Sequence, residues 1–244
     1  MSNKESTYQI GETAPMRYYF RKLRTLFRRS VHRGESHSDM AVAFRSVFKE
    51  NRWGNDESVS GAGSALASPS VRDSVRVLDM VIREFGITSI CDTPCGDFYW
   101  LPLILGRFPK MRYFGFDIVP DLIKWNRERY PERSFQTADV SADVLPPADL
   151  IFCKDLLLHL KSKDIGLTLR NFKKSGSRFL LITSNEGVEN QELEVDDPGA
   201  CRSVNLLASP YNFPNPIWND NYLSLWVLDA IPMAFFDNLC TRLS

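Results

Sequence analysis

Two acidic residues that end short apolar runs are the first candidates for chemistry. Asp92 ends the run 87–92 and is followed by a turn at Gly96, and Asp117 ends the run 113–117, 21 residues beyond Gly96. A glycine lets the backbone pass close to a ligand because it has no Cβ. An acid about 20 residues after such a turn is placed to accept hydrogen bonds from ribose hydroxyls. The pattern therefore predicts a nucleotide-type site at the carboxyl edge of a parallel sheet.

Two later runs also end in titratable residues. Asp139 ends the run 135–139, and Lys154 and Asp155 end the run 150–155. His159 stands four residues after Asp155, and on a helix this spacing places both side chains on one face. Such a pair can take a proton from a hydroxyl group, with His159 as the base and Asp155 fixing its orientation. The competing interpretation of His159 is ordinary packing.

The order of these motifs resembles that of the class I S-adenosylmethionine-dependent methyltransferases. The similarity covers roughly residues 86–184 and is nearest to bacterial methyltransferase-domain proteins with the pattern Asp-x-Pro-Cys-Gly-Asp-Phe-x-Trp. The usual family motif is Asp-x-Gly-x-Gly-x-Gly, and this sequence has Pro94 and Phe98 where glycines are expected.

The resemblance implies a site for S-adenosylmethionine. Asp92 and Gly96 would shape the pocket for the amino-acid portion and the sulfur, and Asp117 would bind the ribose hydroxyls. Asp139 would accept a hydrogen bond from the adenine amino group, with Val140 against the ring. The end of the fourth strand would face the methyl group. The expected cofactor-binding residues are Asp92, Pro94, Cys95, Gly96, Asp97, Asp117, Ile118, Asp139, Val140 and Lys154.

The rest of the chain supplies elements to position these groups. Apolar periodicity predicts helices over 40–49, 70–85, with Ser70 as the N-cap and Gly86 as the stop, 98–105, 120–130 and 162–174. Strands are expected at 87–92, 113–117, 135–139, 150–155, 179–183 and 222–228. This alternation predicts an α/β fold: a Rossmann-like class I methyltransferase sheet, mostly parallel, with helices on both faces and, as the resemblance implies, an antiparallel last strand.

Three segments outside this alternation have their own predictions. Residues 1–34 form a basic N-terminal extension, whose helix at 16–31 either lies on an anionic membrane surface or docks on the methyltransferase domain at 35–244. Residues 57–64 are rich in Ser and Gly and are interpreted as a lid, with a plain connector as the alternative. The loop 184–221 is expected to be ordered near the acceptor site, where Arg202 and Asn205 could hold an anionic or polyhydroxyl acceptor, or serve only the loop.

Charge and cysteine content narrow the class of protein. Residues 1–33 carry a net charge of +6, and the remainder of this neutral chain carries −6, which argues against a nucleic-acid-binding body. Five scattered cysteines without a Cys-x-x-Cys pair fit a reducing cytoplasm, with Cys91 and Cys95 as small buried residues. No run is long enough for a membrane span, so only peripheral contact with the inner membrane surface is considered. Three histidines without ligand spacing predict no metal site.

The sequence is therefore interpreted as an S-adenosylmethionine-dependent methyltransferase that methylates an oxygen of a small or glycan-type acceptor by in-line transfer. One alternative is a nicotinamide-dependent oxidoreductase, which would need a Gly-x-Gly-x-x-Gly turn that residues 95–98 do not provide. The second alternative is a non-catalytic module that binds the cofactor, or that recruits a membrane or a partner through the N-terminal helix.

Overall fold

The computed structural model describes residues 39–54, 56–193 and 199–244. The expected N-terminal helix at 16–31, and with it the predicted membrane contact, lies outside the described residues. Of the helices in the described part of the chain, none has the length and apolar character needed to cross a membrane.

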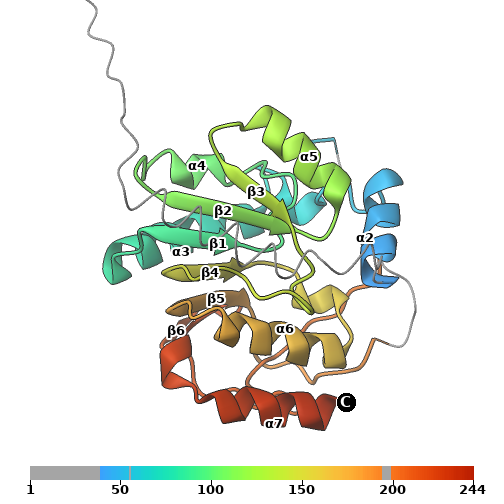
Figure 1. Ribbon diagram of the computed structural model, residues 1–244, viewed down its shortest axis with the longest axis vertical. Helices are drawn as coiled ribbons and strands as arrows, with labels where there is room; N and C mark the ends of the chain where they lie inside the picture. Colours follow the sequence, from blue (N-terminus) through green and yellow to red (C-terminus); the bar gives the residue numbers. More distant parts are fainter. Residues whose placement is uncertain (1–38, 55, 194–198) are drawn as a thin grey trace, which may run out of the picture. The chain divides into compact units, whose positions relative to one another are not determined.

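The centre of the fold is a mostly parallel sheet with the order β3-β2-β1-β4-β5-β7-β6 (Figure 1). Strands β1 to β5 pair in parallel, and β7 runs antiparallel to both β5 and β6. The predicted parallel sheet with an antiparallel last strand is thereby confirmed. The strands are β1 Ser89–Asp92, β2 Arg112–Asp117, β3 Ser134–Thr137, β4 Leu150–Cys153, β5 Phe179–Thr183, β6 Trp218–Asn219 and β7 Leu223–Val227.

The strand order reverses direction between β1 and β4. From β1 the chain proceeds outward to β2 and β3 on one side, and then returns to place β4 and β5 on the other. In open α/β sheets, ligands bind beyond the carboxyl ends of the strands at such a switch point. A ligand site is therefore expected at the residues that follow β1, β2 and β4.

Helices cover both faces of the sheet, because its central strands are apolar on both sides. Every residue of β1, β4 and β5 is buried. Ile90 and Phe152 pack in one core cluster with residues of α3 and α4, whereas the neighbouring Cys91 and Ile151 are buried on the opposite face. The helices are α2 Asp39–Lys49, α3 Pro69–Phe85, α4 Pro102–Leu105, α5 Pro120–Arg129, α6 Ser162–Lys174 and α7 Met233–Leu243.

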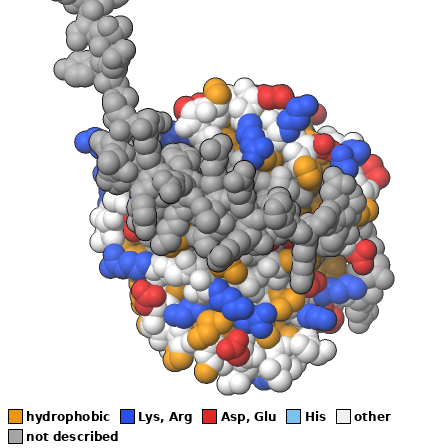
Figure 2. All heavy atoms as spheres, in the orientation of Figure 1, with side chains coloured by type: hydrophobic (Ala, Val, Ile, Leu, Met, Phe, Trp, Pro, Cys, Tyr) orange, Lys and Arg blue, Asp and Glu red, His pale blue; other side chains and the backbone are white. Residues whose placement is uncertain are grey.

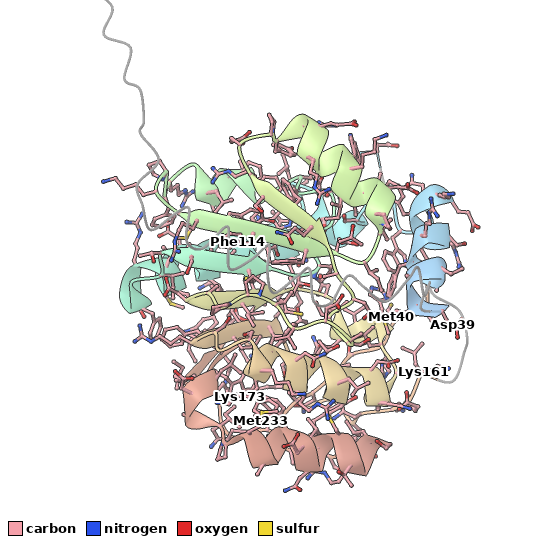
Figure 3. The ribbon with its side chains drawn as sticks, in the orientation of Figure 1. Asp39, Met40, Phe114, Lys161, Lys173 and Met233 are labelled. Atoms are coloured by element: carbon pink, nitrogen blue, oxygen red, sulfur yellow. The ribbon has the colours of Figure 1, made fainter. Side chains whose placement is uncertain are left out.

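The last helix closes the β5 side of the sheet. In Figure 1, α6 and α7 lie near β5, and α5 lies near β3 at the other end. The ammonium of Lys173 on α6 donates to the Leu228 carbonyl at 2.7 Å, shortly before α7 begins at Met233; Figure 3 labels Lys173 and Met233. On the face shown in Figure 2, acidic and basic side chains of the described residues are interspersed.

Several element boundaries differ from the predictions for local reasons. Helix α3 begins at Pro69, so that Ser68 and not Ser70 is the N-cap, because proline is pre-organised for the first helical position. The predicted stop at Gly86 is confirmed, with φ +62°. Strand β3 ends at Thr137, two residues before Asp139. The short strand β6 was not expected; it lies inside the predicted loop 184–221 and pairs with β7.

Candidate active site

The turn after β1 is tied to the end of β2 by a carboxylate. The Gly96 amide donates to Oδ2 of Asp117 at 3.1 Å, and the Val119 amide donates to Oδ1 at 3.0 Å. Burial raises the pKa of Asp117 to about 6, although these backbone donors oppose that rise. The 21-residue spacing noted in the sequence therefore brings the glycine turn and the acid into direct contact.

Phe98 has a backbone conformation that glycine adopts more readily than other residues. Its φ is +56°, in the left-handed region, so the expected helix at 98–105 begins only at Pro102. The strain of this backbone is offset by burial of the ring, which lies 4.8 Å from Tyr113, 4.8 Å from Tyr130 and 5.2 Å from Phe135, measured between centroids. The departure from the glycine motif thus leaves the turn itself intact.

Asp92 is a buried acid with one strong donor. The Tyr113 hydroxyl donates to its Oδ2 at 2.6 Å, and the residue is 4% exposed. Burial raises the pKa of Asp92 to about 7, while the Tyr113 hydrogen bond acts in the opposite direction. This acid changes its charge near neutral pH.

The segment predicted as a lid lies over the glycine turn and is held there by Asp97. The hydroxyl of Ser58 and the amide of Val59 donate to Oδ2 of Asp97 at 2.8 and 3.1 Å. Ser60 donates its hydroxyl to Oδ1 at 3.2 Å and accepts from the Asp97 amide at 2.9 Å. A Cβ on Gly96 would lie 2.4 Å from the Ser60 hydroxyl, so this close approach requires glycine. We call residues 57–64 the lid segment, after that prediction.

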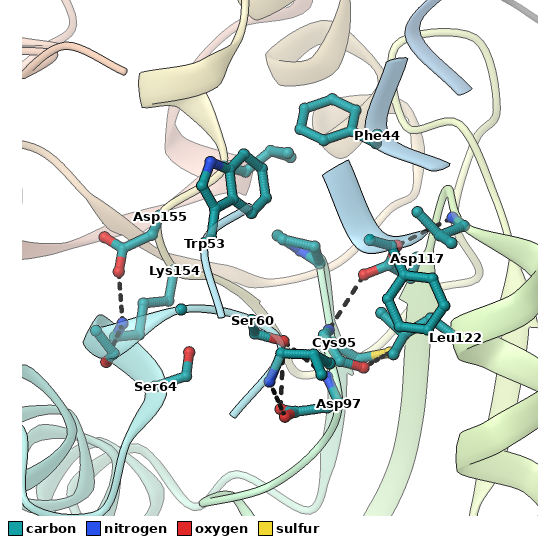
Figure 4. Close-up of a pocket in the computed structure, with 18 of the residues that line it drawn as sticks. Phe44, Trp53, Ser60, Ser64, Cys95, Asp97, Asp117, Leu122, Lys154 and Asp155 are labelled. Carbon is teal, nitrogen blue, oxygen red and sulfur yellow. Dashed lines mark hydrogen bonds and ion pairs between the residues drawn. The ribbon is translucent and has the colours of Figure 1, made fainter. Parts of the chain in front are cut away.

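Between the lid segment and the strand ends lies a cavity of about 410 Å³ (Figure 4). Its volume is in the range of small-molecule sites. Of the residues predicted from the sequence, the cavity is lined by Asp92, Pro94, Cys95, Gly96, Asp97, Asp117, Ile118, Lys154, Asp155 and His159.

Asp139 and Val140 line an adjoining hollow. This hollow shares Pro94, Asp117 and Ile118 with the main cavity. The carboxylate of Asp139 accepts from the amide and hydroxyl of Ser141 at 3.0 and 2.6 Å. The three strand-end acids Asp92, Asp117 and Asp139 therefore gather at one edge of the sheet.

On the β4 side of the cavity, Lys154 and Asp155 form an ion pair. The ammonium of Lys154 also donates to the Gly63 carbonyl at 3.2 Å, which ties the lid segment to β4. The Asp155 carboxylate accepts from the Tyr222 hydroxyl at 2.8 and 2.9 Å and from Thr183 at 3.3 Å. Figure 4 shows the pair on the same side of the cavity as Ser64 of the lid segment. Tyr222 had no signal in the sequence, because it comes from just before β7.

His159 is held by the long loop and not by Asp155. Asp155 has φ +56° and precedes the short helix Leu157–His159, so the expected helical face does not exist. Instead, Nδ1 of His159 donates to the Ala200 carbonyl at 2.8 Å. A carbonyl only accepts, so this bond places the neutral ring's proton on Nδ1 and its lone pair on Nε2. Burial lowers the pKa of His159, which favours this neutral form.

Aromatic rings complete the wall around His159. The ring of Trp53 stacks on it with centroids 4.2 Å apart, and the indole N–H donates to the Gly199 carbonyl at 3.1 Å. Phe44 of α2 lies with its ring edge-on to both, at 5.8 Å from Trp53 and 6.2 Å from His159. Phe44 could not be found from the sequence because nothing in the sequence brings α2 to the end of β4.

Arg202 and Asn205 serve the loop and not the acceptor. Arg202 donates to the carbonyls of Gln191 and Leu160 at 2.6 and 2.7 Å. Asn205 donates from its side chain to the Val188 carbonyl at 3.2 Å and accepts from the Leu207 amide at 3.0 Å. Neither residue lines the cavity, so an anionic acceptor does not find its counter-charge there.

Comparison with known proteins finds similarity of structure but not of sequence. No protein-family model and no curated protein matches the chain. Among solved structures, magnesium protoporphyrin IX methyltransferase from Synechocystis PCC 6803 with bound SAM has a TM-score of 0.47 and 16% identity over 66% of this chain and 83% of its own. The methyltransferase domain of bacterial CtHen1 has a TM-score of 0.42 and 13% identity over 46% of this chain and 65% of its own.

A third solved structure is an amino pentose methyltransferase from Micromonospora echinaspora involved in calicheamicin biosynthesis. Its TM-score is 0.41, with 18% identity over 47% of this chain and 50% of its own length. The strand order, with its antiparallel β7 beside β5, is what gives this chain the Rossmann-like fold of the class I methyltransferases.

Proposed function

We propose that the protein is an S-adenosylmethionine-dependent methyltransferase that acts on an oxygen of a small or glycan-type acceptor. The observation that carries this proposal is the acid excess of the cavity. Its described lining contains Asp92, Asp97 and Asp117 around the glycine turn, whereas its one lysine, Lys154, is paired with Asp155. S-Adenosylmethionine is a cation at its sulfonium, and carboxylates in a partly buried cavity favour such a ligand.

The same charges argue against a nicotinamide dinucleotide. A diphosphate would need backbone N–H groups at a helix N-terminus. Here α4 starts at Pro102, well beyond the Gly96 turn, and proline has no N–H to offer. The two negative phosphates would instead meet Asp92 and Asp117 across the turn.

The strand-end positions suggest how the cofactor would be held. Asp117 and Ile118 would bind the ribose, and Asp92, Pro94, Cys95 and Gly96 would surround the amino-acid portion. Asp139 would accept from the adenine amino group, with Val140 against the ring, at the mouth of the adjoining hollow, whose volume of about 30 Å³ is too small to enclose the ring. Asp97 would act indirectly, by holding the lid segment over the cofactor.

When bound, the cofactor supplies a methyl group already activated for in-line displacement, so the protein has to align the acceptor and manage one proton. His159 would take the proton of the acceptor hydroxyl on Nε2, because Nδ1 is fixed by Ala200. Asp155 would act as a positioning residue, since it holds Lys154 and Tyr222.

Calorimetry with S-adenosylhomocysteine and with NAD tests the cofactor assignment. We expect micromolar-range binding of S-adenosylhomocysteine and none of NAD. Asp117→Asn should weaken S-adenosylhomocysteine binding by about tenfold or more, because one acceptor oxygen becomes a donor. Asp73→Asn, an exposed acid on α3, is the matched control and should leave the affinity unchanged. Binding of NAD alone would overturn the proposal.

His159→Asn separates catalysis from binding. Its amide keeps a donor near the position of Nδ1 but has no base at the position of Nε2. We expect methyl transfer to an acceptor library to fall by a factor of about 10²–10⁴, while S-adenosylhomocysteine affinity stays the same. If the wild type binds S-adenosylhomocysteine but transfers no methyl group to any acceptor, the non-catalytic alternative is correct.

A further inference from the structure

The side of the cavity near the β4 end is an aromatic wall, by which we mean Phe44, Trp53 and His159. All three residues line the cavity; Phe44 and Trp53 are near neighbours in the sequence, and His159 follows Trp53 by more than 100 residues. Trp53 and His159 stack with their planes 25° apart, whereas Phe44 meets them edge-on. In the view of Figure 4, Phe44 and Trp53 lie on the side of the cavity opposite Ser60 and Asp97.

The aromatic wall is held in place by residues 199–202. The carbonyls of Gly199 and Ala200 accept from the Trp53 indole and from Nδ1 of His159. The Arg202 amide donates to the Leu158 carbonyl at 3.1 Å, and its side chain donates to the Leu160 carbonyl at 2.7 Å, on either side of His159. The polar N–H groups of both rings are thus satisfied, and a pre-organised wall loses little entropy on binding.

Near this wall, charges of both signs are already paired. Lys154 is bonded to Asp155 and to the Gly63 carbonyl, and its ammonium lies 5.9 Å from the Tyr222 ring centroid. Asp155 is bonded to Lys154, Tyr222 and Thr183. Apart from His159, Lys154 is the basic side chain in the described lining. A charged acceptor would lose its hydration without gaining a new counter-charge.

We propose that the acceptor is an uncharged hydroxyl compound that presents a flat ring face to the aromatic wall. This inference rests on the proposed methyltransferase function, since it concerns the second substrate of the same site. The flat face is either an aromatic ring or the C–H face of a sugar, because both pack on an indole. The hydroxyl group at the edge of that ring would meet Nε2 of His159, the nitrogen left without its proton.

Calorimetry on the protein saturated with S-adenosylhomocysteine tests this inference. The neutral probes are para-hydroxyacetophenone and methyl β-glucoside, which distinguish the aromatic ring from the sugar. Their anionic counterparts are para-hydroxybenzoate and methyl β-glucuronoside, and tyramine is the cationic probe. We expect at least one neutral probe to bind about tenfold or more tightly than its anionic counterpart and than tyramine.

Trp53→Ala and Trp53→Phe separate the ring face from the fold. Trp53→Ala should weaken binding of the neutral probe by about tenfold. Trp53→Phe keeps a flat ring but loses the hydrogen bond to Gly199, and it should weaken this binding by less than half as much in free energy. Both variants should keep the wild-type affinity for S-adenosylhomocysteine, and the Phe variant preserves the test if the Ala variant does not fold.

Three outcomes would overturn the inference. They are equal or tighter binding of a charged probe, no binding of either neutral probe up to about 10 mM, and a loss of S-adenosylhomocysteine affinity in Trp53→Ala that equals the loss for the probe. The last outcome would assign the wall to the cofactor. Failure of the wild type to bind S-adenosylhomocysteine at all is distinct from these, because it would refute the proposed function itself.

Discussion

Removing the Ser58 hydroxyl should release the lid segment. In the structure this hydroxyl donates to the Asp97 carboxylate at 2.8 Å, and the residues are 1% and 8% exposed. A hydrogen bond to a charged group contributes about 1.5–3 kcal/mol when both groups are buried. Ser58→Ala should therefore shift the equilibrium between closed and open lid by about tenfold to a hundredfold.

The observable is the dissociation rate of S-adenosylhomocysteine, measured by stopped-flow displacement. If the lid closes over the ligand, dissociation from Ser58→Ala should be faster by up to the same factor of about ten to a hundred. Ser177→Ala is the matched control. Its hydroxyl is also buried and accepts from the Ala148 amide at 3.0 Å, but it lies before β5, at the opposite edge of the sheet. This control should lower the free energy of unfolding and leave the dissociation rate unchanged.

A double-mutant cycle with Asp97→Asn decides whether the two residues act through one contact. If they do, adding Ser58→Ala to Asp97→Asn should have a smaller effect than Ser58→Ala alone, with a coupling of about 1 kcal/mol or more. Fully additive effects would show that the two residues act through separate contacts. A dissociation rate in Ser58→Ala within about twofold of wild type would show that the lid segment does not gate the cavity.

Three further predictions concern the strand ends. Asp92 and Asp117 have folded-state pKa values of about 7 and about 6, above the ordinary 3.8, so the folded protein binds their protons more tightly than the unfolded chain. Their contribution to stability is complete below pH 3.8 and is lost as the pH rises through 6 and 7. Urea unfolding at a series of pH values should therefore show a free energy of unfolding that falls with pH over this range. Asp92→Asn should remove the part of this fall that occurs near pH 7, and an unchanged pH dependence in the variant would contradict the assignment. Gly96→Ala should lower both stability and S-adenosylhomocysteine affinity, because φ is +53° and the new Cβ would lie 2.4 Å from the Ser60 hydroxyl. Gly176→Ala is the control for the backbone strain, since Gly176 also has positive φ but no atom lies within 4 Å of its added Cβ. An equal loss of stability in the two variants would show that the contact with Ser60 is unimportant. Tyr113→Phe should cost about 1–3 kcal/mol in urea unfolding at pH 8, where Asp92 is ionised, and less at pH 5, where it is protonated; a cost independent of pH would mean that the hydroxyl does not serve the carboxylate.

Local sequence was sufficient for the sheet and for the acids at its edge. Short apolar runs that alternate with helical patterns predicted strands β1 to β5 and β7. A parallel sheet places the carboxyl ends of its strands at one edge, and this does not depend on the conformation of the loops. The spacing of Gly96 and Asp117 predicted that both lie at this edge, and the hydrogen bond between them is a finding of the structure. The stop of α3 at Gly86 is equally local, since it depends on one residue that tolerates positive φ.

Only the tertiary structure decided what surrounds the reactive positions. Trp53, His159 and Ala200 meet although more than 100 residues separate the first from the second, and no periodicity in the sequence encodes such a contact. For the same reason the sequence assigned His159 to Asp155, its near neighbour, whereas the fold gives His159 to Ala200 and Asp155 to Lys154 and Tyr222. Strand-end acids follow from the backbone pattern, but the partner of each side chain depends on which distant segment packs against it.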